Sequence, residues 1–238
     1  MKIEGKNAVR ECIYANKTIE KVLVQNGSDN KELVSLAKER GIKVQFVNKS
    51  ALDDFSATKK HQGIIAIATD FKYSSIEDIL ALAKNKNEDA FILILDGVED
   101  PHNLGSVLRV AECAGVHGVI IPKDRAVGVT ETVVKVSAGA TERVKIAKVT
   151  NLNRAIEELK AKNIFVYCAD MDGAPMTKTN LTGNIALVVG SEGFGVSKLT
   201  RKLADGIISI PMFGKINSLN ASVSAGIVVY EAIRQRKN

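Results

Sequence analysis

The sequence predicts an α/β fold built in two parts, and three observations lead to this prediction. Apolar, β-branched runs that end at glycine or proline alternate with segments of helical periodicity through most of the 238 residues. A polar run, residues 84–89, interrupts this alternation once. Near the C-terminus, two predicted strands are each followed by a loop rich in Gly, Ser or Asn. Ligands bind at such strand ends in open α/β sheets, so we expect a site there.

The composition favours a globular protein with a polyanionic partner. Hydrophobic residues make up 45% of the chain, and the net charge is +6. Residues 1–72 hold 13 Lys and Arg against 9 Asp and Glu, an excess of four, whereas the remainder has 20 against 18, an excess of two. No run reaches transmembrane length, no signal-peptide core follows Met1, and the three cysteines lie far apart. We therefore expect a cytoplasmic protein with reduced thiols and no membrane contact.

Residues 1–72 are predicted to form a small α/β domain, because strands and helices alternate over this stretch. One helix is expected to have Asp29 as its N-cap and to end at Gly41. The expected elements are helix 7–13, strand 21–25, helix 29–41, strand 44–47, helix 51–55 and strand 64–68.

Residues 73–89 are predicted to be a linker, and residues 90–238 a second domain. The linker holds a short helix, 76–83, that Ser74 or Ser75 caps. The elements expected in the second domain are strand 91–95, helix 104–114, strand 118–121, a strand near 144–146, helix 152–162, strands 164–168, 185–189 and 207–210, and helix 223–236.

The first candidate site is the segment from Asp96 to Arg109, which follows a predicted buried strand and opens a helix. If Asn103 lies in the first helical turn, the six positions to Arg109 rotate the chain by about 600° and leave the two side chains about 120° apart. Both could still border one cleft. For a lone Asn and a lone Arg, a helix cap and a surface cation are the simpler interpretation.

The second candidate is the glycine-rich turn from Gly190 to Gly195. Glu192 stands where a dinucleotide-binding G-x-G-x-x-G turn needs its second glycine, and Gly214-Lys215-Ile216 lacks the Ser or Thr of a P-loop. An acidic side chain here disfavours a phosphate and suits a neutral or cationic ligand.

The third candidate is Ser218-Leu219-Asn220, a helix-entry segment that by itself indicates only N-capping. Two other chemistries are not indicated. The three histidines are scattered, so no metal site is expected, and no G-x-S-x-G elbow points to a serine hydrolase.

Together these segments resemble the three motifs of the SpoU (TrmH-type) family of S-adenosylmethionine-dependent RNA ribose 2′-O-methyltransferases. In chain order the motifs are Asp100-Pro101-His102-Asn103-Leu104-Gly105 with Arg109, Val188-Val189-Gly190-Ser191-Glu192-Gly193, and Ile210-Pro211-Met212 with Ser218-Leu219-Asn220. Two shorter segments, Gly5-Lys6-Asn7-Ala8-Val9-Arg10 and Lys60-His61-Gln62-Gly63, are similar to the substrate-binding domain of the subgroup that modifies 23S ribosomal RNA.

The resemblance implies a SPOUT methyltransferase domain with a parallel sheet and a deep trefoil knot, preceded by an L30e-like substrate-binding domain. It also implies a homodimer with active sites at the interface and no metal. We expect the C-terminal helix to contribute to that interface through Val228, Val229 and Ile233.

The resemblance further assigns the site residues. Backbone groups around Gly190, Ile210 and Leu219 would hold S-adenosyl-L-methionine. Arg109 would assist deprotonation of the ribose hydroxyl or orient it, and Glu192 would hold Arg109 or the loop. The residues expected to position the target nucleotide and the loops are Asn103, Ser218 and Asn220.

The expected activity is methyl transfer to a ribose 2′-hydroxyl of RNA, with a guanosine of 23S rRNA as the first target. A tRNA guanosine 2′-O-methyltransferase and a non-catalytic RNA-binding or ribosome-assembly protein stay open as alternatives. The N-terminal domain favours rRNA, and the complete set of expected catalytic residues favours an enzyme. A nucleotide-dependent oxidoreductase lacks the glycine spacing it needs.

Overall fold

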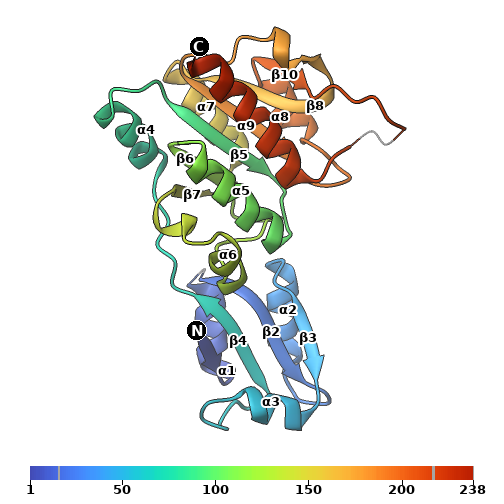
Figure 1. The fold of residues 1–238 in the computed structure, drawn as a ribbon. Coiled ribbons are helices and arrows are strands. Elements are labelled where there is room, and N and C mark those ends of the chain that lie inside the picture. The colour runs from blue at the N-terminus through green and yellow to red at the C-terminus, as the bar shows by residue number, and fades with distance from the viewer. Residues whose placement is uncertain (16, 216–217, 238) are drawn as a thin grey trace. The chain divides into compact units, whose positions relative to one another are not determined.

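The computed structural model describes residues 1–15, 17–215 and 218–237, which divide into two compact units (Figure 1). The first unit is Met1–Lys72 with Gly128–Glu131, and the second is Tyr73–Val127 with Thr132–Asn238. The segment 73–89, expected as a linker, contains α4 (Ile76–Asn85). Ile76, Ile79 and Ala83 of this helix are buried in the core of the second unit.

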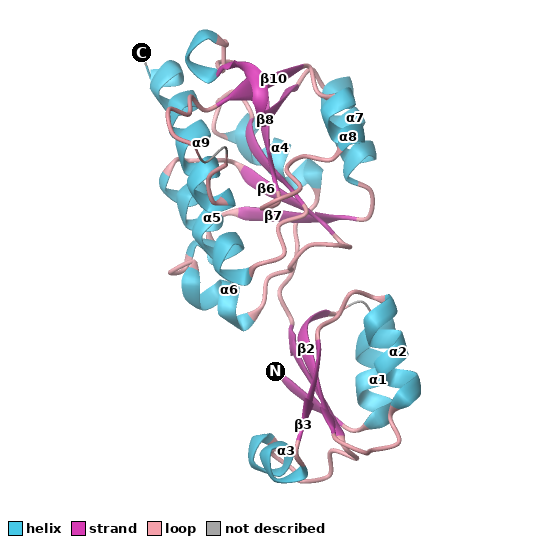
Figure 2. Cartoon of the chain, turned by 90° about the vertical axis from the view of Figure 1, so that its right-hand side faces the viewer, coloured by secondary structure: helices cyan, strands magenta, loops and turns pink. Residues whose placement is uncertain are grey.

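The first unit is a four-stranded mixed sheet with strand order β1-β4-β2-β3 and helices on both faces (Figure 2). β4 (Ile64–Thr69) runs antiparallel to both β1 (Lys2–Glu4) and β2 (Thr18–Gln25), and β3 (Val44–Val47) runs parallel to β2. Because strand side chains alternate between faces, Val22 and Val24 pack with α1 (Lys6–Tyr14) and α2 (Lys31–Glu39). Leu23 packs on the other face with α3 (Lys49–Phe55).

In the first unit one local prediction was wrong and one strand was not predicted. The N-cap of α2 is Asn30 rather than Asp29, whose backbone carbonyl instead accepts a hydrogen bond from Lys6 Nζ at 2.7 Å. Strand β1 was not predicted, because three residues are too few to show an alternating pattern.

The second unit is a six-stranded, fully parallel sheet with strand order β10-β8-β9-β5-β6-β7. The prediction of a parallel α/β domain is therefore confirmed. The strands are β5 (Phe91–Asp96), β6 (Gly118–Pro122), β7 (Lys145–Val149), β8 (Phe165–Pro175), β9 (Ile185–Gly190) and β10 (Gly206–Ser209).

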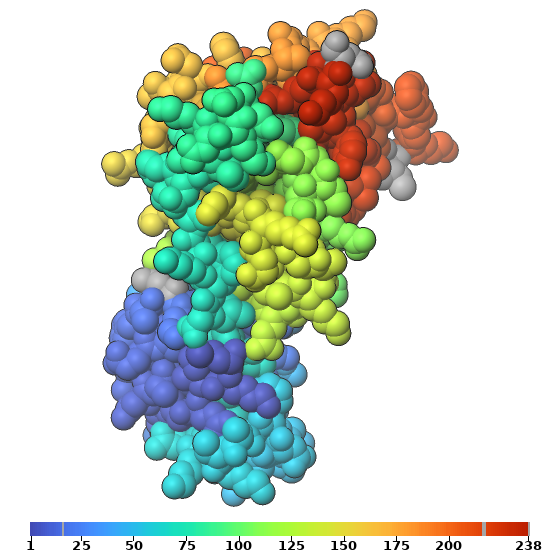
Figure 3. Space-filling model, turned by 60° about the vertical axis from the view of Figure 1, so that its left-hand side comes forward, coloured from blue at the N-terminus to red at the C-terminus, as the bar shows by residue number. Residues whose placement is uncertain are grey.

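Helices cover both faces of this sheet, which is why its central strands are apolar throughout. α4 and α7 (Leu152–Ala161) pack on one face. α5 (Pro101–Cys113) and α9 (Ala221–Lys237) cover the other face and lie side by side, as the green and red segments of Figure 3 show. The shorter elements are α6 (Glu131–Val136), α8 (Lys198–Leu203) and the 3-10 helices η1 (Ala140–Glu142) and η2 (Met176–Lys178).

Strand β8 is longer than the predicted strand 164–168 because it pairs with β10 twice. β10 lies beside Tyr167 and Cys168, and after a shift in register beside Ala174 and Pro175. The intervening residues 169–173 therefore bulge out of the ladder. Gly173 permits the close crossing, since a Cβ there would lie 2.6 Å from the backbone of Ile207.

In the C-terminal helix, two of the residues expected at a dimer interface lie in the core instead. Val228 and Val229 of α9 are fully buried inside the unit, so the prediction that they supply apolar surface to a second copy was wrong. The exposed apolar residues of this helix are Val223 and Tyr230. The predicted knot concerns how loops thread past one another, which strand order does not specify, and it stays a prediction.

Candidate active site

Three loops meet at the C-terminal edge of the parallel sheet in the second unit. Asp96 at the end of β5 lies in register with Gly190 at the end of β9, so the segments that follow these strands begin side by side. The N-terminus of α9 joins them there, because Asn220 directly before it bonds to the loop after β9. This is the edge at which open α/β sheets bind ligands.

In the segment after β5, Asp100 and not Asn103 is the N-cap of α5. Asp100 caps α5, because its Oδ1 accepts hydrogen bonds from the backbone N–H groups of His102 at 2.7 Å and Asn103 at 2.9 Å. Pro101 stands at the first helical position, where the missing N–H costs nothing. The simpler interpretation of Asn103 as a cap is therefore wrong, and its side chain is available for other contacts.

Asn103, Glu192 and Asn220 form one hydrogen-bonded network. The Asn103 side-chain amide donates to Glu192 Oε1 at 3.1 Å, and the Asn220 amide donates to the same oxygen and to Asn103 Oδ1 at 2.9 Å. The backbone N–H of Ala221 also donates to Glu192 Oε1, at 3.4 Å. One carboxylate thus connects all three sequence motifs.

Asn220 is also the cap that the sequence indicated. Its Oδ1 accepts hydrogen bonds from the backbone N–H groups of Ser222 at 2.9 Å and Val223 at 3.3 Å. Because the cap fixes this side chain, its amide nitrogen is directed toward Asn103 and Glu192.

A cavity of about 410 Å³ lies beside this network. Of the predicted residues, Gly190, Ile210, Leu219, Ser218 and Glu192 line it. Asn103 and Asn220 do not line the cavity themselves and connect to it through Glu192. The other lining side chains include Asp170, Met171, Asp172, Phe194, Arg201 and Met212.

Gly190 must be glycine for the loop after β9 to close. A Cβ at this position would lie 2.0 Å from the backbone carbon of Gly195, far inside contact distance. Ser191 and Gly195 exchange backbone hydrogen bonds of 3.2 and 3.0 Å, and Gly193 and Gly195 have positive φ angles of 86° and 65°. Residues 190–196 therefore form a tight turn against the strand end.

The cavity carries an excess of negative charge. Arg201 pairs with Asp170 at 3.0 Å and with Asp172 at 3.5 Å, and Glu192 is a third carboxylate. Arg201 is the one cationic side chain among the described residues that line the cavity. Asp170, Asp172 and Arg201 were missed by the sequence analysis. The two aspartates lie two and four residues beyond the end of the predicted strand 164–168, which was the available signal.

Arg109 neither lines the cavity nor joins the hydrogen-bonded network. It lies exposed on α5, and within the described ranges no hydrogen bond or ion pair involves its guanidinium. Glu192 holds the two asparagines rather than this arginine.

Among the residues that the structure describes, no group of three or more His, Cys, Asp or Glu side chains is arranged to hold a metal ion. Over the same residues, no helix is long and apolar enough to cross a membrane.

Both parts of the chain match family models of RNA methyltransferases. Residues 90–230 match the model of the SpoU rRNA Methylase family, and residues 2–74 match the model for RNA 2′-O ribose methyltransferase substrate binding. The chain therefore belongs to the SpoU family of RNA methyltransferases. The predictions of this family and of an RNA 2′-O-ribose methyltransferase are confirmed.

Individual relatives are similar to this chain over nearly its whole length. The Bacillus subtilis protein YacO, named for the TrmH family of tRNA/rRNA methyltransferases, is 43% identical over 98% of this chain and 94% of its own length. The crystal structure of an RNA 2′-O ribose methyltransferase is 28% identical, covers 100% of this chain and 89% of that one, and has a TM-score of 0.58. AviRb from Streptomyces viridochromogenes, crystallised with the cofactor AdoMet, shares the fold at a TM-score of 0.64, with 22% identity over 99% of this chain and 90% of its own.

Proposed function

We propose that this protein transfers a methyl group from S-adenosylmethionine to a ribose 2′-hydroxyl of RNA, with a guanosine of 23S rRNA as the target. The network of Asn103, Glu192 and Asn220 beside the 410 Å³ cavity is the observation that carries the proposal. It supports a single site in which cofactor and ribose lie next to each other.

The cavity suits S-adenosylmethionine in size and charge. Its volume lies in the range of small-molecule sites, roughly 300–1,000 Å³. Ile210 and Leu219 offer apolar contacts, and backbone groups at Gly190 offer hydrogen bonds without a side chain in the way. When bound, the cofactor supplies a methyl group on a positively charged sulfonium. The excess of carboxylates over Arg201 favours that charge.

The side chains around the cavity have separate tasks in this proposal. A ribose 2′-hydroxyl is a poor nucleophile, so it needs both orientation and removal of its proton. Glu192 holds the amides of Asn103 and Asn220 in place, and Ser218 adds a hydroxyl at the rim. Arg109 is exposed and free to contact the ribose or an adjacent phosphate. Since Arg stays protonated, its task is to orient and polarise the hydroxyl, and the proton released on methyl transfer passes to the adjacent RNA phosphate or to water.

The proposal includes a division of labour and an assembly. Residues 1–72 provide RNA affinity, and residues 90–238 provide cofactor binding and chemistry. The catalytic part is knotted, and two copies pair in the cytoplasm with α9 at the interface. The exposed Val223 and Tyr230 support this pairing, because they are seven residues apart and so share one face of the helix, with the half-exposed Ile227 between them.

The substrate proposal is tested by methyl transfer to RNA from a strain that lacks the gene. Labelled S-adenosylmethionine and the purified protein should introduce label into 23S rRNA, at the 2′-oxygen of one guanosine. Label in tRNA alone would support the alternative target, which the tRNA/rRNA name of the B. subtilis relative keeps open. Label in neither RNA, with cofactor binding intact, would contradict the proposal.

A further inference from the structure

A second cavity, of about 490 Å³, lies in the first unit and shares no residue with the one described above. It lies where β2 ends, α3 begins and the loop before β4 turns. Its lining residues are Gln25, Ser28, Lys49, Asp53, Lys59, His61, Gln62 and Gly63.

The loop beside this cavity is held in an unusual shape. Lys59 and Gln62 have positive φ angles of 58° and 52°, which side chains other than glycine rarely adopt, and Gly63 follows at 76°. Such conformations persist where the surrounding contacts fix them, and they gather at functional sites. The contacts that fix this loop come from His61 and Glu4.

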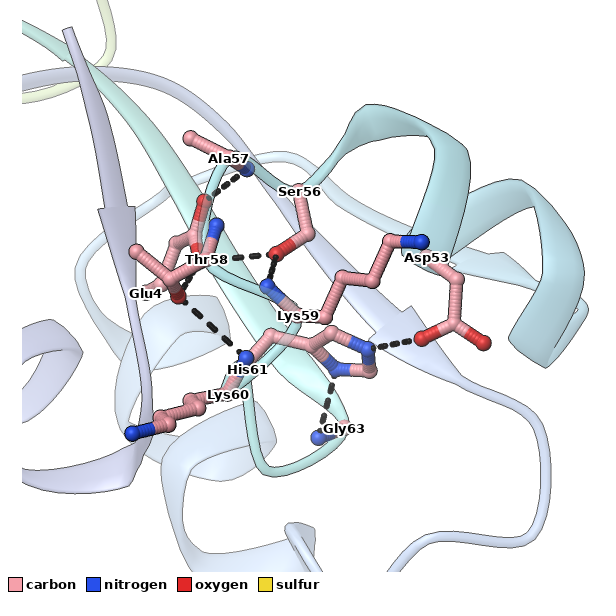
Figure 4. Close-up of polar contacts among 9 residues, drawn as sticks. All are labelled: Glu4, Asp53, Ser56, Ala57, Thr58, Lys59, Lys60, His61 and Gly63. Atoms are coloured by element: carbon pink, nitrogen blue, oxygen red, sulfur yellow. Dashed lines mark hydrogen bonds and ion pairs between the residues drawn. The ribbon is translucent and has the colours of Figure 1, made fainter.

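His61 holds the loop from inside, as Figure 4 shows. Its ring is buried, and its Nδ1 accepts a hydrogen bond from the backbone N–H of Gly63 at 3.0 Å. The proton of the neutral ring therefore lies on Nε2, which donates to Asp53 Oδ1 at 2.8 Å. This hydrogen bond, with the positive charges of Lys49 and Lys59 nearby, lowers the pKa of Asp53. Oδ1 of Asp53 is thus bonded to His61.

Glu4 holds the start of the loop. Its carboxylate accepts hydrogen bonds from the Ser56 hydroxyl at 2.8 Å, the Ala57 backbone N–H at 2.7 Å and the hydroxyl of Thr58 (Figure 4). These donors, the Thr58 hydroxyl first, lower the pKa of Glu4 to about 2. The Ser56 hydroxyl in turn accepts from the Lys59 backbone N–H at 2.7 Å. Glu4 therefore stabilises the backbone of the loop and forms no ion pair with Lys59.

Two ammonium groups are left at the cavity. Within the part of the chain that the structure describes, neither Lys49 Nζ nor Lys59 Nζ has an ion-pair or hydrogen-bond partner. Among the described residues that line the cavity, Asp53 supplies the one carboxylate, and its Oδ1 already accepts the hydrogen bond from His61. Among the described residues that line the cavity there is no Phe, Tyr or Trp, and the His61 ring is buried, so stacking on a base is not its purpose. A polar hollow with two free cations fits a phosphodiester.

We propose that this cavity binds one phosphodiester of the RNA substrate, with Lys49 and Lys59 pairing with its oxygens. Gln25 and Gln62 contact the adjoining ribose or base edge. Gln62 suits this role because its Oε1 is fixed by the backbone N–H of Lys6 at 2.9 Å, which leaves its amide nitrogen to donate. His61 and Asp53 are positioning residues that keep the loop in its binding shape. The inference rests on the proposed function only in taking RNA as the ligand.

The test measures RNA binding by the full-length protein at several salt concentrations, with a 23S rRNA transcript as the probe. A double variant, Lys49→Gln with Lys59→Gln, should lower the slope of log affinity against log salt by roughly 1.4 to 1.8, since each lost phosphate contact lowers it by roughly 0.7 to 0.9. The matched control is Lys38→Gln with Lys43→Gln, which removes the same charge from the last turn of α2 and from the exposed residue directly before β3. An equal loss in both double variants would overturn the proposal.

A second pair of variants separates positioning from charge. Asp53→Ala removes a negative charge next to the two lysines, so charge alone predicts tighter RNA binding. If the hydrogen bond to His61 shapes the site, Asp53→Ala should instead weaken binding several-fold. Asp53→Asn keeps an oxygen acceptor for Nε2 and should bind at least as tightly as the parent protein. Tighter binding by Asp53→Ala would overturn the positioning role.

This experiment is independent of catalysis. Binding is measured without turnover, and unchanged S-adenosylmethionine affinity and thermal unfolding show that each variant is folded. Loss of RNA binding by both double variants alike would reject the cavity while leaving the proposed methyl transfer intact. A parent protein that binds the transcript through these lysines but never methylates it would reject the proposed function alone.

Discussion

The side-chain amide of Asn103 donates a hydrogen bond to Oε1 of Glu192 at 3.1 Å, although 89 residues separate the two in the sequence. The bond joins the first turn of α5 to the loop after β9, and Asn220 closes the network from the start of α9. Because Glu192 Oε1 accepts hydrogen bonds from the side-chain amides of both asparagines, the geometry of the three loops depends on Glu192.

Replacing Glu192 with Gln should therefore disturb the chemistry more than the fold. The change preserves shape, but it removes the charge that attracts the two asparagine amides. Since small misplacements of reacting groups can cost about 100-fold in rate, we expect a drop of about that size in methyl transfer. Single-turnover kinetics with saturating RNA and cofactor measure it. Glu157→Gln, which removes an exposed carboxylate on α7 that does not line the cavity, is the matched control and should keep the full rate. Equal rates in both variants would show that the Glu192 charge does not contribute to methyl transfer.

Arg109→Ala should abolish methyl transfer and leave most RNA affinity. The guanidinium is exposed and unpaired within the described residues, so its removal should cost less than about 0.5 kcal/mol in stability. Arg154→Ala, an exposed arginine in the first turn of α7, is the control and should be fully active. Initial rates with 23S rRNA, together with RNA-binding curves, decide the matter. An Arg109→Ala protein with normal kcat would show that this residue does not touch the reacting ribose.

Leu219→Trp is the cleaner test of the cofactor site. A Trp at Gly190 would also block the cavity, but even one added carbon there would lie 2.0 Å from the backbone of Gly195 and force the loop open. Leu219 is 36% exposed and lines the cavity, so a larger side chain can fill the space without straining the core. We expect calorimetry to show loss of S-adenosylmethionine binding with little change in the unfolding temperature. Full affinity in Leu219→Trp would place the cofactor elsewhere.

The sequence predicted best those elements whose pattern is local. β5 and β9 are buried on both faces, so their apolar runs placed the predicted strands within one residue of the observed ones. The bulge at 169–173 was missed because it arises from pairing between β8 and β10, which lie more than thirty residues apart. In the site, too, local motifs could be predicted and long-range pairings could not. The motifs supplied Asn103, Glu192 and Asn220, whereas the pairing of Asp170 and Asp172 with Arg201 depends on that bulge.

Glu4 gives the first unit a distinct pH dependence. Its pKa in the folded protein is about 2, below the ordinary value of 4.5, because the carboxylate accepts hydrogen bonds from residues 56–58. A lowered pKa means that the stabilisation is complete above pH 4.5 and is lost as the pH falls toward 2. Urea unfolding of the full chain across this range should show a shallower acid loss in Glu4→Gln than in the parent protein. Glu39→Gln, an exposed carboxylate at the end of α2, should leave the curve unchanged. Parallel curves for Glu4→Gln and the parent protein would contradict the assignment.

The last prediction concerns where the catalytic part of the chain begins. Ile79 of α4 packs so closely on β6 that a Cβ at Gly118 would lie 2.4 Å from it, and Ile76 and Ala83 are buried in the same core. Each buried isoleucine contributes roughly 1.5–3 kcal/mol. A fragment of residues 84–238 should therefore fail to fold, whereas residues 73–238, which keep α4, should bind S-adenosylmethionine nearly as tightly as the full chain.

If residues 1–72 provide RNA affinity, the longer fragment should also bind 23S rRNA weakly and methylate it slowly. Calorimetry and rate measurements on the two fragments separate these points. Cofactor binding by residues 84–238 would show that α4 is dispensable, and normal methylation by residues 73–238 would contradict the division of labour.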